Sequence, residues 1–183
     1  MGRRLLLLGP PGAGKGTQAQ VVCRALGIAH VSTGAMLREH VEEGTDLGRL
    51  AKAIMDTGDL VSDAIVVAMV AERLSRDDAI CGWLLDGFPR NASQADALDG
   101  ILGDGGIDTV VLVDVPEEEI LARVLARGRS DDTAETTRTR LAVYREQTAP
   151  LIELYEQRGL VRRVDGVGAI PEVLCRIVEV LAQ

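Results

Sequence analysis

The chain has 183 residues, of which 46% are hydrophobic and 26% charged, as in one globular domain with a well-buried core. Its net charge of −8 and pI of about 4.8 argue against long nucleic acids as partners, since these need a basic face, and aromatic residues, at 2%, are too few for base stacking. The longest N-terminal apolar run, Leu5–Leu8, is too short for a signal peptide or membrane helix, so we expect a cytoplasmic protein with no membrane partner.

Short Leu- and Val-rich runs alternate along the chain with helical patterns. We expect strands at Arg4–Leu8, Ala29–Val31, Trp83–Leu85, Thr109–Val113 and Val161–Val164. We expect helices at Lys15–Leu26, Ala35–Glu42, Leu47–Met55, Asp63–Leu74, Ser93–Leu102, Pro116–Ala126, Ala134–Gln157 and Ile170–Leu181. This alternation predicts an α/β fold, a five-stranded parallel sheet with helices on both faces. Ligands of such sheets bind beyond the carboxyl ends of the strands.

The segment Gly9–Thr17, GPPGAGKGT, connects the first strand to the first helix. A glycine-rich turn at a helix N-terminus points backbone N–H groups at one spot, and Lys15 adds a mobile charge, which together predict a phosphate site. A tight turn with an exposed lysine is the less favoured alternative. Gly16 stands where most P-loops carry Ser or Thr, so direct metal ligation by a hydroxyl there is not expected. This form resembles nucleoside monophosphate kinases more than GTPases or motor ATPases.

Two segments interrupt the alternation of strands and helices. Residues 32–61 insert helices between the second and third strands, and residues 128–134 form a short polar break between two long helices. Each pattern fits a flap that closes over a ligand. It fits equally well a helical excursion and an ordinary loop.

A second anion site is predicted where the third strand ends. Asp86 follows that strand, and an acidic residue beside a P-loop commonly orients magnesium or its water shell. Arg90 offers a planar donor fork for a phosphate, and Arg38, after the second strand, is placed to meet the same anion. A surface turn set by Gly87 and Pro89 would leave Arg90 without a role.

Further arginines gather near the polar break, at Arg123, Arg127, Arg129, Arg138 and Arg140. Arg123 and Arg127 share one helix face, where like charges repel unless an anion or a carboxylate pairs with them. We interpret Arg138 as part of a solvated helix face. For the others an anion-binding role is favoured.

The three cysteines, Cys23, Cys81 and Cys175, are widely separated and include no C-x-x-C pair. This spacing predicts neither a zinc site nor a disulfide framework. We expect buried free thiols in a reducing cytosol.

Taken together, these motifs resemble those of adenylate kinases with a short lid, over nearly the whole chain. Four of them match in order and spacing, GPPGAGKGT, HVSTGAMLRE (30–39), GDLVSD (58–63) and LLDGFPRNASQ (84–94), and the segment 127–141 also matches. The resemblance implies a P-loop NTPase-like fold for a single domain spanning 1–183. It divides the chain into a core of 1–31, 62–127 and 135–183, a helical flap at 32–61 that binds the nucleoside monophosphate (NMP), and a lid at 128–134.

The resemblance also implies the role of each site residue. The ATP site would comprise Gly12, Ala13, Gly14, Lys15, Gly16, Thr17, Arg123, Arg127 and the backbone at Gly168. The AMP site would comprise Thr33, Arg38, Asp59, Leu60, Val61, Gly87, Phe88, Pro89, Arg90, Gln94, Arg129 and Arg140. Lys15, Arg90, Arg129 and Arg140 would act on the transferring phosphoryl group, and Asp86 would hold Mg²⁺ through water.

The implied reaction is the reversible, Mg²⁺-dependent transfer of the terminal phosphoryl group of ATP to AMP, giving two ADP and maintaining adenine nucleotide homeostasis. A monomer would carry it out, with ATP, AMP and ADP as its only partners. Structural zinc is not expected, because the lid lacks the long insertion and four cysteines of metal-binding relatives. The chain departs from the family at Ala35, usually acidic, and at Ser62, usually proline.

This chemistry needs no catalytic base, because the accepting phosphate is already an anion. Accordingly we expect neither His30 nor His40 near a phosphate motif. In-line positioning and cancellation of charge on the transferring group are required instead. Exclusion of water is also needed, because ATP would otherwise be hydrolysed.

Three other functions fit this sequence less well. UMP/CMP kinases usually carry alanine where Thr33 stands and another residue where Gln94 stands, so both positions favour adenine. A kinase that phosphorylates a hydroxyl would need a base, which the sequence does not offer. A non-catalytic nucleotide-binding or switch module would need no second arginine-lined phosphate site.

Overall fold

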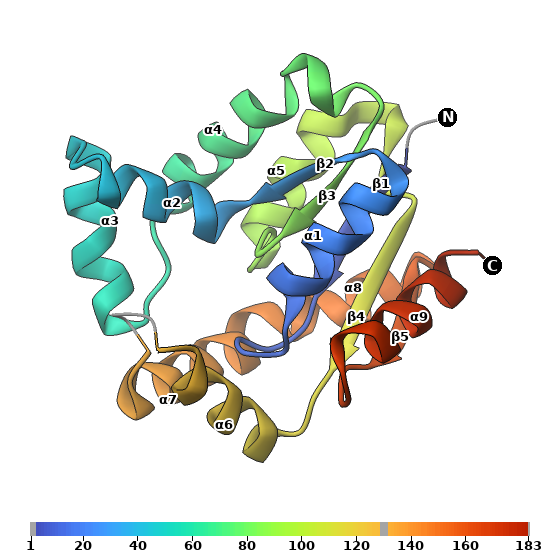
Figure 1. Cartoon of the computed structure of the whole chain (residues 1–183). Coiled ribbons are helices and arrows are strands. Elements are labelled where there is room, and N and C mark those ends of the chain that lie inside the picture. Colours follow the sequence, from blue (N-terminus) through green and yellow to red (C-terminus); the bar gives the residue numbers. More distant parts are fainter. Residues whose placement is uncertain (1–2, 129–131, 183) are drawn as a thin grey trace.

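The computed structural model describes residues 3–128 and 132–182 (Figure 1). These residues form the strands β1 (Arg3–Leu8), β2 (Ala29–Ser32), β3 (Gly82–Asp86), β4 (Thr109–Asp114) and β5 (Val161–Asp165). They form the α-helices α1 (Lys15–Leu26), α2 (Thr33–Glu42), α3 (Asp46–Thr57), α4 (Asp63–Leu74), α5 (Ala92–Leu102), α6 (Glu117–Arg127), α7 (Ala134–Val143), α8 (Pro150–Gln157) and α9 (Ile170–Leu181). Short helical turns of other types are η1 (Asp77–Ala79), η2 (Gly103–Gly105) and the π-helical η3 (Tyr144–Thr148).

All the strands run parallel in one sheet, in the order β2-β3-β1-β4-β5, which confirms the predicted five-stranded parallel sheet. From β1 the chain passes first to β2 and β3 on one side, and then to β4 and β5 on the other. Where crossovers diverge in this way, a crevice opens beyond the carboxyl ends of the strands. The loop Gly9–Gly14 follows β1 directly and therefore lies at this crevice.

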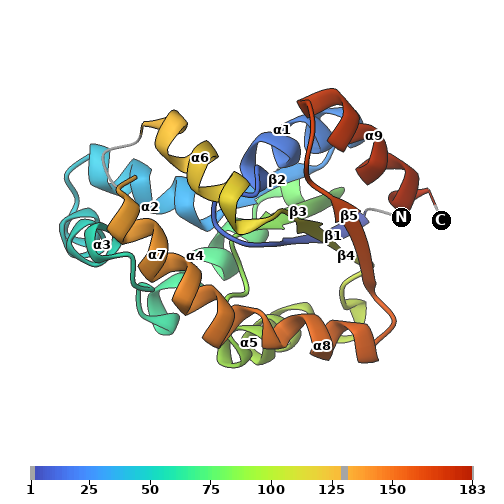
Figure 2. The same ribbon diagram turned by 90° about the horizontal axis from the view of Figure 1, so that it is seen from below.

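Helices cover both faces of the sheet, as predicted. Figure 2 shows α1 and α9 above the sheet, and α4, α5 and α8 below it. Successive side chains of a strand point to opposite faces, so Leu5 and Leu7 of β1 pack with the α1 and α9 layer. Leu6 and Leu8 join the other layer. The central strands β1, β3 and β4 therefore carry runs of buried apolar residues, and they hold the crevice on a rigid base.

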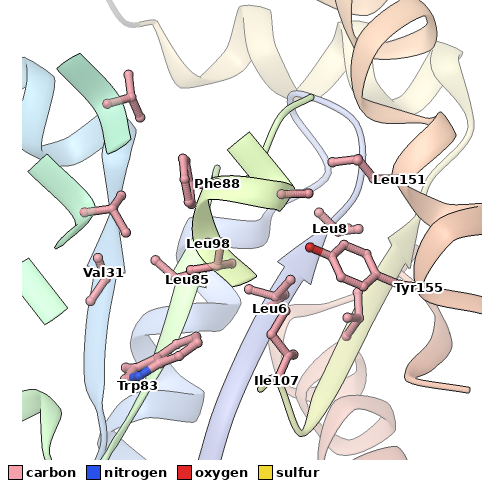
Figure 3. Close-up of a cluster of buried hydrophobic side chains, with 14 of the residues drawn as sticks. Leu6, Leu8, Val31, Trp83, Leu85, Phe88, Leu98, Ile107, Leu151 and Tyr155 are labelled. Atoms are coloured by element: carbon pink, nitrogen blue, oxygen red, sulfur yellow. The ribbon is translucent and has the colours of Figure 1, made fainter. Parts of the chain in front are cut away.

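The larger cluster of buried side chains lies beneath the sheet (Figure 3). Leu6, Leu85 and Leu98 are fully buried, and Tyr155 of α8 packs beside Leu8. Burying a leucine contributes about 1.5–3 kcal/mol, so this cluster is a main source of stability. Since it includes residues of β1 and β3, it fixes where the ends of both strands stand.

One long helix was predicted at 134–157, and this was wrong in detail. The segment forms α7 and α8, separated by the π-helical turn η3, in which the Ala149 N–H donates to the Tyr144 carbonyl at 2.8 Å. Pro150 accounts for the break, because it has no N–H and its ring collides with the carbonyl four residues earlier in a regular helix. The other predicted elements agree with the structure to within two residues at each end.

The prediction of three buried thiols was right only for Cys23. Burial raises the pKa of the Cys23 thiol to about 12, which keeps it protonated and unreactive. Cys81 and Cys175 are exposed, and all three are free. Within 3–128 and 132–182, the helices are too short or too polar to cross a bilayer.

Candidate active site

A cavity of about 680 Å³ opens beyond the carboxyl edge of the sheet. Its wall is made of the loop after β1, the ends of β2 and β3, the loop after α3 and side chains of α6 and α7. Among the residues predicted for the site, all that the structure describes line this cavity except Phe88, which is buried in the core. Arg129 lies outside the described residues. Two predicted phosphate sites thus share one hollow.

Gly12 gives the loop after β1 its close fit against α6. Its φ of +85° is in the region that favours glycine, and a Cβ added there would stand 2.7 Å from Val124 Cγ2 and 2.9 Å from Ile120 Cγ2. A side chain would therefore push α6 away from the loop. Because α6 also carries Arg123 and Arg127, this contact sets how far those arginines stand from the loop.

Lys15, the first residue of α1, folds back over its own loop. Its Nζ donates to the carbonyl oxygens of Gly9 at 2.7 Å and of Pro10 at 2.8 Å. Burial lowers the pKa of the Lys15 ammonium to about 8, although the nearby Asp86 carboxylate acts to raise it. The ammonium is therefore charged at neutral pH, but less firmly than an exposed lysine.

Asp86, the last residue of β3, lies across from the start of α1. Its Oδ2 accepts from Ser32 Oγ at 3.2 Å, and a Cβ added at Gly16 would stand 3.3 Å from the same oxygen. Burial alone would raise the pKa of Asp86, but the His30 ring and the Lys15 charge hold it below its usual value. The carboxylate is thus ionised. It also lies close to Gly16, so a side chain there would require the carboxylate to move by a few tenths of an ångström.

The expectation for His30 was wrong, because it lines the cavity. Its Nε2 lies 3.6 Å from Asp86 Oδ2, since Ser32 of β2 pairs with Asp86 of β3 and His30 points to the same face two residues earlier. Seen from the sequence alone, its place in the HVSTGAMLRE motif was the only sign of this contact. Ser32 and Tyr144 also line the cavity and were not predicted.

The other end of the cavity is organised around the carbonyl oxygen of Gly87. Thr33 Oγ1 donates to it at 2.9 Å and Arg90 Nε at 2.7 Å. A Cβ at Gly87 would stand 3.1 Å from Thr33 Oγ1 and from Arg90 Nη2, so only glycine lets both groups converge. Thr148 of η3 fixes the Arg90 backbone by donating from Oγ1 to its carbonyl at 2.6 Å. The π-helical turn thus buttresses this end.

Arg90 itself is a half-buried cation that lines the cavity. Burial lowers the pKa of its guanidinium, and the Asp86 carboxylate opposes this shift. Arginine stays charged in proteins, so the lowered pKa marks a partly desolvated charge rather than a titrating group. An anionic ligand would stabilise that charge.

Gln94 lies in the first turn of α5 and is only 1% exposed. Its Oε1 accepts from the Arg90 N–H at 2.8 Å, and its Nε2 donates to Asp63 Oδ1 at 2.7 Å. Each end of the amide is therefore held by one partner, and the side chain still lines the cavity.

Carboxylates accompany the arginines of α6, as the repulsion between like charges requires. Arg123 pairs with Glu119 at 2.8 Å and donates to the Gly166 carbonyl at 3.0 Å. Arg127 binds Asp132 through two hydrogen bonds, of 2.6 and 2.7 Å. Both arginines face the cavity at the P-loop end.

Arg140 of α7 links the two sides of the cavity. Its Nη1 lies 3.5 Å from Asp132 Oδ1, and its Nη2 donates to the carbonyl of Met55 in α3 at 3.3 Å. The end of α3 is thus tied to α7 across the opening. Arg138 is exposed, as the interpretation of a solvated face predicted.

Comparisons with known proteins agree with this arrangement. The family model described as adenylate kinase matches residues 7–160. Three relatives named adenylate kinase are similar over nearly their whole length: 54% identity to that of Thermobifida fusca (strain YX), covering 97% of each chain; 51% to that of Synechococcus sp. (strain RCC307), covering 100% of each; and 51% to that of Stenotrophomonas maltophilia (strain R551-3), covering 95% of this chain and 96% of the relative. Because the family model spans most of the chain and these relatives are more than half identical to it, the chain belongs to the adenylate kinase family.

Proposed function

We propose that ATP occupies the P-loop end of the cavity and AMP the Arg90 end, so that the terminal phosphoryl group of ATP faces its acceptor. The chain catalyses the reaction of its family, the reversible transfer of that group to AMP, which gives two ADP and balances the adenine nucleotides. The observation that carries the assignment is the shared cavity, which is lined by the half-buried cations Lys15 and Arg90.

At the ATP end, the backbone N–H groups of the P-loop and the N-terminus of α1 receive the phosphates. The residues we assign are Gly12, Ala13, Gly14, Lys15, Gly16 and Thr17, with Arg123, Arg127 and the backbone at Gly168 around the nucleoside. The contact between Gly12 and α6 supports this assignment, because it brings both arginines to the loop.

At the AMP end, we assign the phosphate to Arg38 and Arg90, and the base to Thr33 and Gln94. Asp59, Leu60, Val61, Gly87 and Pro89 form the rest of the wall. Phe88 supports this wall from the core rather than touching the ligand. We also propose that residues 32–61 act as the monophosphate flap and 128–134 as the lid, within a monomer located in the cytoplasm.

The transfer step needs charge cancellation more than proton transfer. The phosphoryl group would be surrounded during its transfer by Lys15, Arg90 and Arg140, which would stabilise its negative charge. We predict the same role for Arg129. Arg140 supports closure as well, because it already ties α7 to α3. A closed cavity excludes water, which would otherwise take the phosphoryl group.

Magnesium fits this site as a partner of the nucleotide. Mg²⁺ commonly uses one or two carboxylates plus substrate phosphates, and Asp86 supplies one ionised carboxylate beside the P-loop. No cluster of three or more His, Cys, Asp or Glu is placed to hold a metal among residues 3–128 and 132–182. Asp86 would hold the ion through water, and the ion would neutralise phosphate charge.

An acceptor panel tests the proposed division of the site. With ATP and magnesium, AMP should support ADP formation at least tenfold faster, in kcat/KM, than CMP or UMP, because a site built to hydrogen-bond its ligand rejects mismatched partners. Thr33→Ala combined with Gln94→Asn should lower the ratio of kcat/KM for AMP to kcat/KM for CMP or UMP. The dissociation constant of ATP should stay unchanged. An undiminished preference in the double variant would contradict the assignment of these two side chains.

ATP affinity should fall as the pH rises through about 8. The phosphates favour the charged form of Lys15, whose pKa in the free protein is about 8 and must be higher in the complex. Above the free-protein pKa, binding has to take up a proton, so the dissociation constant rises by up to about tenfold per pH unit. Calorimetry between pH 7.5 and 9.5 would measure this. Lys15→Arg, charged throughout, should flatten the profile, and a flat wild-type profile would contradict the role of Lys15.

A further inference from the structure

The carboxylate of Asp63 holds two side-chain amides at the AMP end of the cavity. Nε2 of Gln94 donates to Oδ1 at 2.7 Å, and Nδ2 of Asn91 donates to Oδ1 at 3.0 Å and to Oδ2 at 3.2 Å. Asp63 is the first residue of α4, while Asn91 caps α5 and Gln94 lies in its first turn. None of the roles assigned above involves Asp63.

The partners of these amides fix which way each one points. An ionised carboxylate can only accept and a backbone N–H can only donate. Gln94 meets one of each, because its Oε1 accepts from the Arg90 N–H at 2.8 Å. Turning the amide over would place its NH₂ against that N–H and its oxygen against Asp63. The orientation therefore follows from the chemistry of the partners.

Asn91 is held in the same way and reinforces the arrangement. Its Oδ1 accepts from the backbone N–H of Gln94 at 2.9 Å, while its Nδ2 faces Asp63. A turned Asn91 would lose the cap of α5 and would repel Gln94 N–H. One carboxylate thus accepts from both amides and, together with the two backbone N–H groups, fixes their direction.

The fixed amide has one N–H and one lone pair left for a ligand. Gln94 is buried and lines the cavity, so these two groups are available only on the ligand side. A donor beside an acceptor matches adenine, whose N1 accepts and whose 6-amino group donates. Hypoxanthine offers the reverse pair, a 6-carbonyl that accepts and an N1–H that donates. A freely turning glutamine would serve both bases equally well.

We propose that Asp63 is a positioning residue that determines base specificity: by fixing the Gln94 amide, it makes the site reject purine monophosphates that carry a carbonyl at C6. This inference rests on the proposed function, in which Gln94 reads the base of AMP. Inosine monophosphate (IMP) is the sharpest probe, because its base differs from that of AMP only along the edge that Gln94 would read.

The test compares kcat/KM for AMP and IMP in wild type and in Asp63→Asn. The new amide has the shape of the carboxylate but can accept or donate, so the turned Gln94 regains a partner. We expect the preference for AMP over IMP to fall about tenfold, as for loss of a hydrogen bond to a charged group. The Arg90 N–H still favours the original orientation, so some preference remains. The KM for ATP should not change.

Two variants serve as controls. Asp96→Asn makes the same change on α5 at an exposed position two residues from Gln94, and it should keep the wild-type preference. Asp63→Glu keeps a carboxylate and should retain more of the preference than Asp63→Asn. If circular dichroism shows that Asp63→Asn does not fold, Asp63→Ser replaces it, since a hydroxyl also accepts or donates, and the same loss is expected.

The outcomes distinguish a failure of the role proposed for Asp63 from a failure of the proposed function. If Gln94→Leu loses the AMP preference while Asp63→Asn keeps it, or lowers turnover of AMP and IMP equally, the role of Asp63 is overturned and the proposed function stands. If Gln94→Leu keeps the preference, or wild type does not phosphorylate AMP, the proposed function itself fails and this inference fails with it.

Discussion

Replacing Lys15 by methionine should lower kcat by about a hundredfold or more, the loss expected when a charge that stabilises the transition state is removed. The Lys15 ammonium donates to two carbonyls of the P-loop and lines the same cavity as Arg90. No neighbouring lysine can replace it, because Lys52 is the only other lysine in the chain and it does not line the cavity. Steady-state turnover with saturating ATP and AMP would measure the loss.

The fold should survive this substitution, because Lys15 contacts only two loop carbonyls through its amine. Lys52→Met is the matched control: its lysine is exposed and pairs with Asp56 within α3, where an ion pair contributes little. We expect that variant to keep wild-type turnover. A Lys15→Met protein that unfolds, or that turns over at a near-normal rate, would count against the assigned role.

Two adenosines joined by five phosphates should bind at least a hundredfold more tightly than ATP or AMP. Such a molecule would fill both ends of the cavity at once and meet Lys15, Arg38, Arg90 and Arg140 together. The second nucleotide then binds without the entropy cost of a separate association. Titration calorimetry, with competition where the affinity is too high, would give the dissociation constants.

The length of the phosphate chain supplies the control for this experiment. Two adenosines joined by only three phosphates cannot span both ends, so they should bind no more tightly than ATP. Arg90→Met should weaken binding of the five-phosphate compound more than binding of ATP, because Arg90 lies at the AMP end. Equal affinities for the long compound and for ATP would show that the two ends cannot be occupied face to face.

The P-loop was predictable because its nine-residue motif and the two elements that flank it are adjacent in the sequence. A strand, the run Gly9–Thr17 and a helix are local features, and each follows from side-chain pattern and backbone preference. The meeting of Asp86 and Arg90 with the P-loop was also predictable, because parallel strands bring their carboxyl ends to one edge. The order of the strands was not, since it depends on how helices pack between them.

Because the strand order could not be predicted, the position of His30 was predicted wrongly. β2 pairs with β3 in a register that sets Ser32 opposite Asp86, and this brings His30 within 3.6 Å of the Asp86 carboxylate. The residues are 56 positions apart in the chain, so no local pattern reports the contact. The pairing of Arg127 with Asp132 was different: the helix spacing predicted an anion or a carboxylate as the partner, but Asp132 lies beyond the end of α6, where helix spacing does not identify it.

The π-helical turn η3 could not be predicted from the sequence for a different reason. Pro150 predicts a break, but not that the chain would stay helical with one wider turn before it. This turn brings Thr148 to the Arg90 carbonyl and Tyr144 to the cavity wall. Likewise, the contacts of Asp63 with Asn91 and Gln94 join two helices, α4 and α5, whose packing the sequence pattern does not specify.

The most direct test of phosphoryl transfer between two facing nucleotides is to supply ADP and magnesium alone. If one ADP occupies each end of the cavity, the protein should convert two ADP into ATP and AMP in equal amounts, which phosphorus NMR or chromatography would follow to equilibrium. We expect this conversion to proceed with no release of inorganic phosphate. ADP that stays unchanged in the presence of active protein, while ATP is hydrolysed to ADP and phosphate, would contradict it.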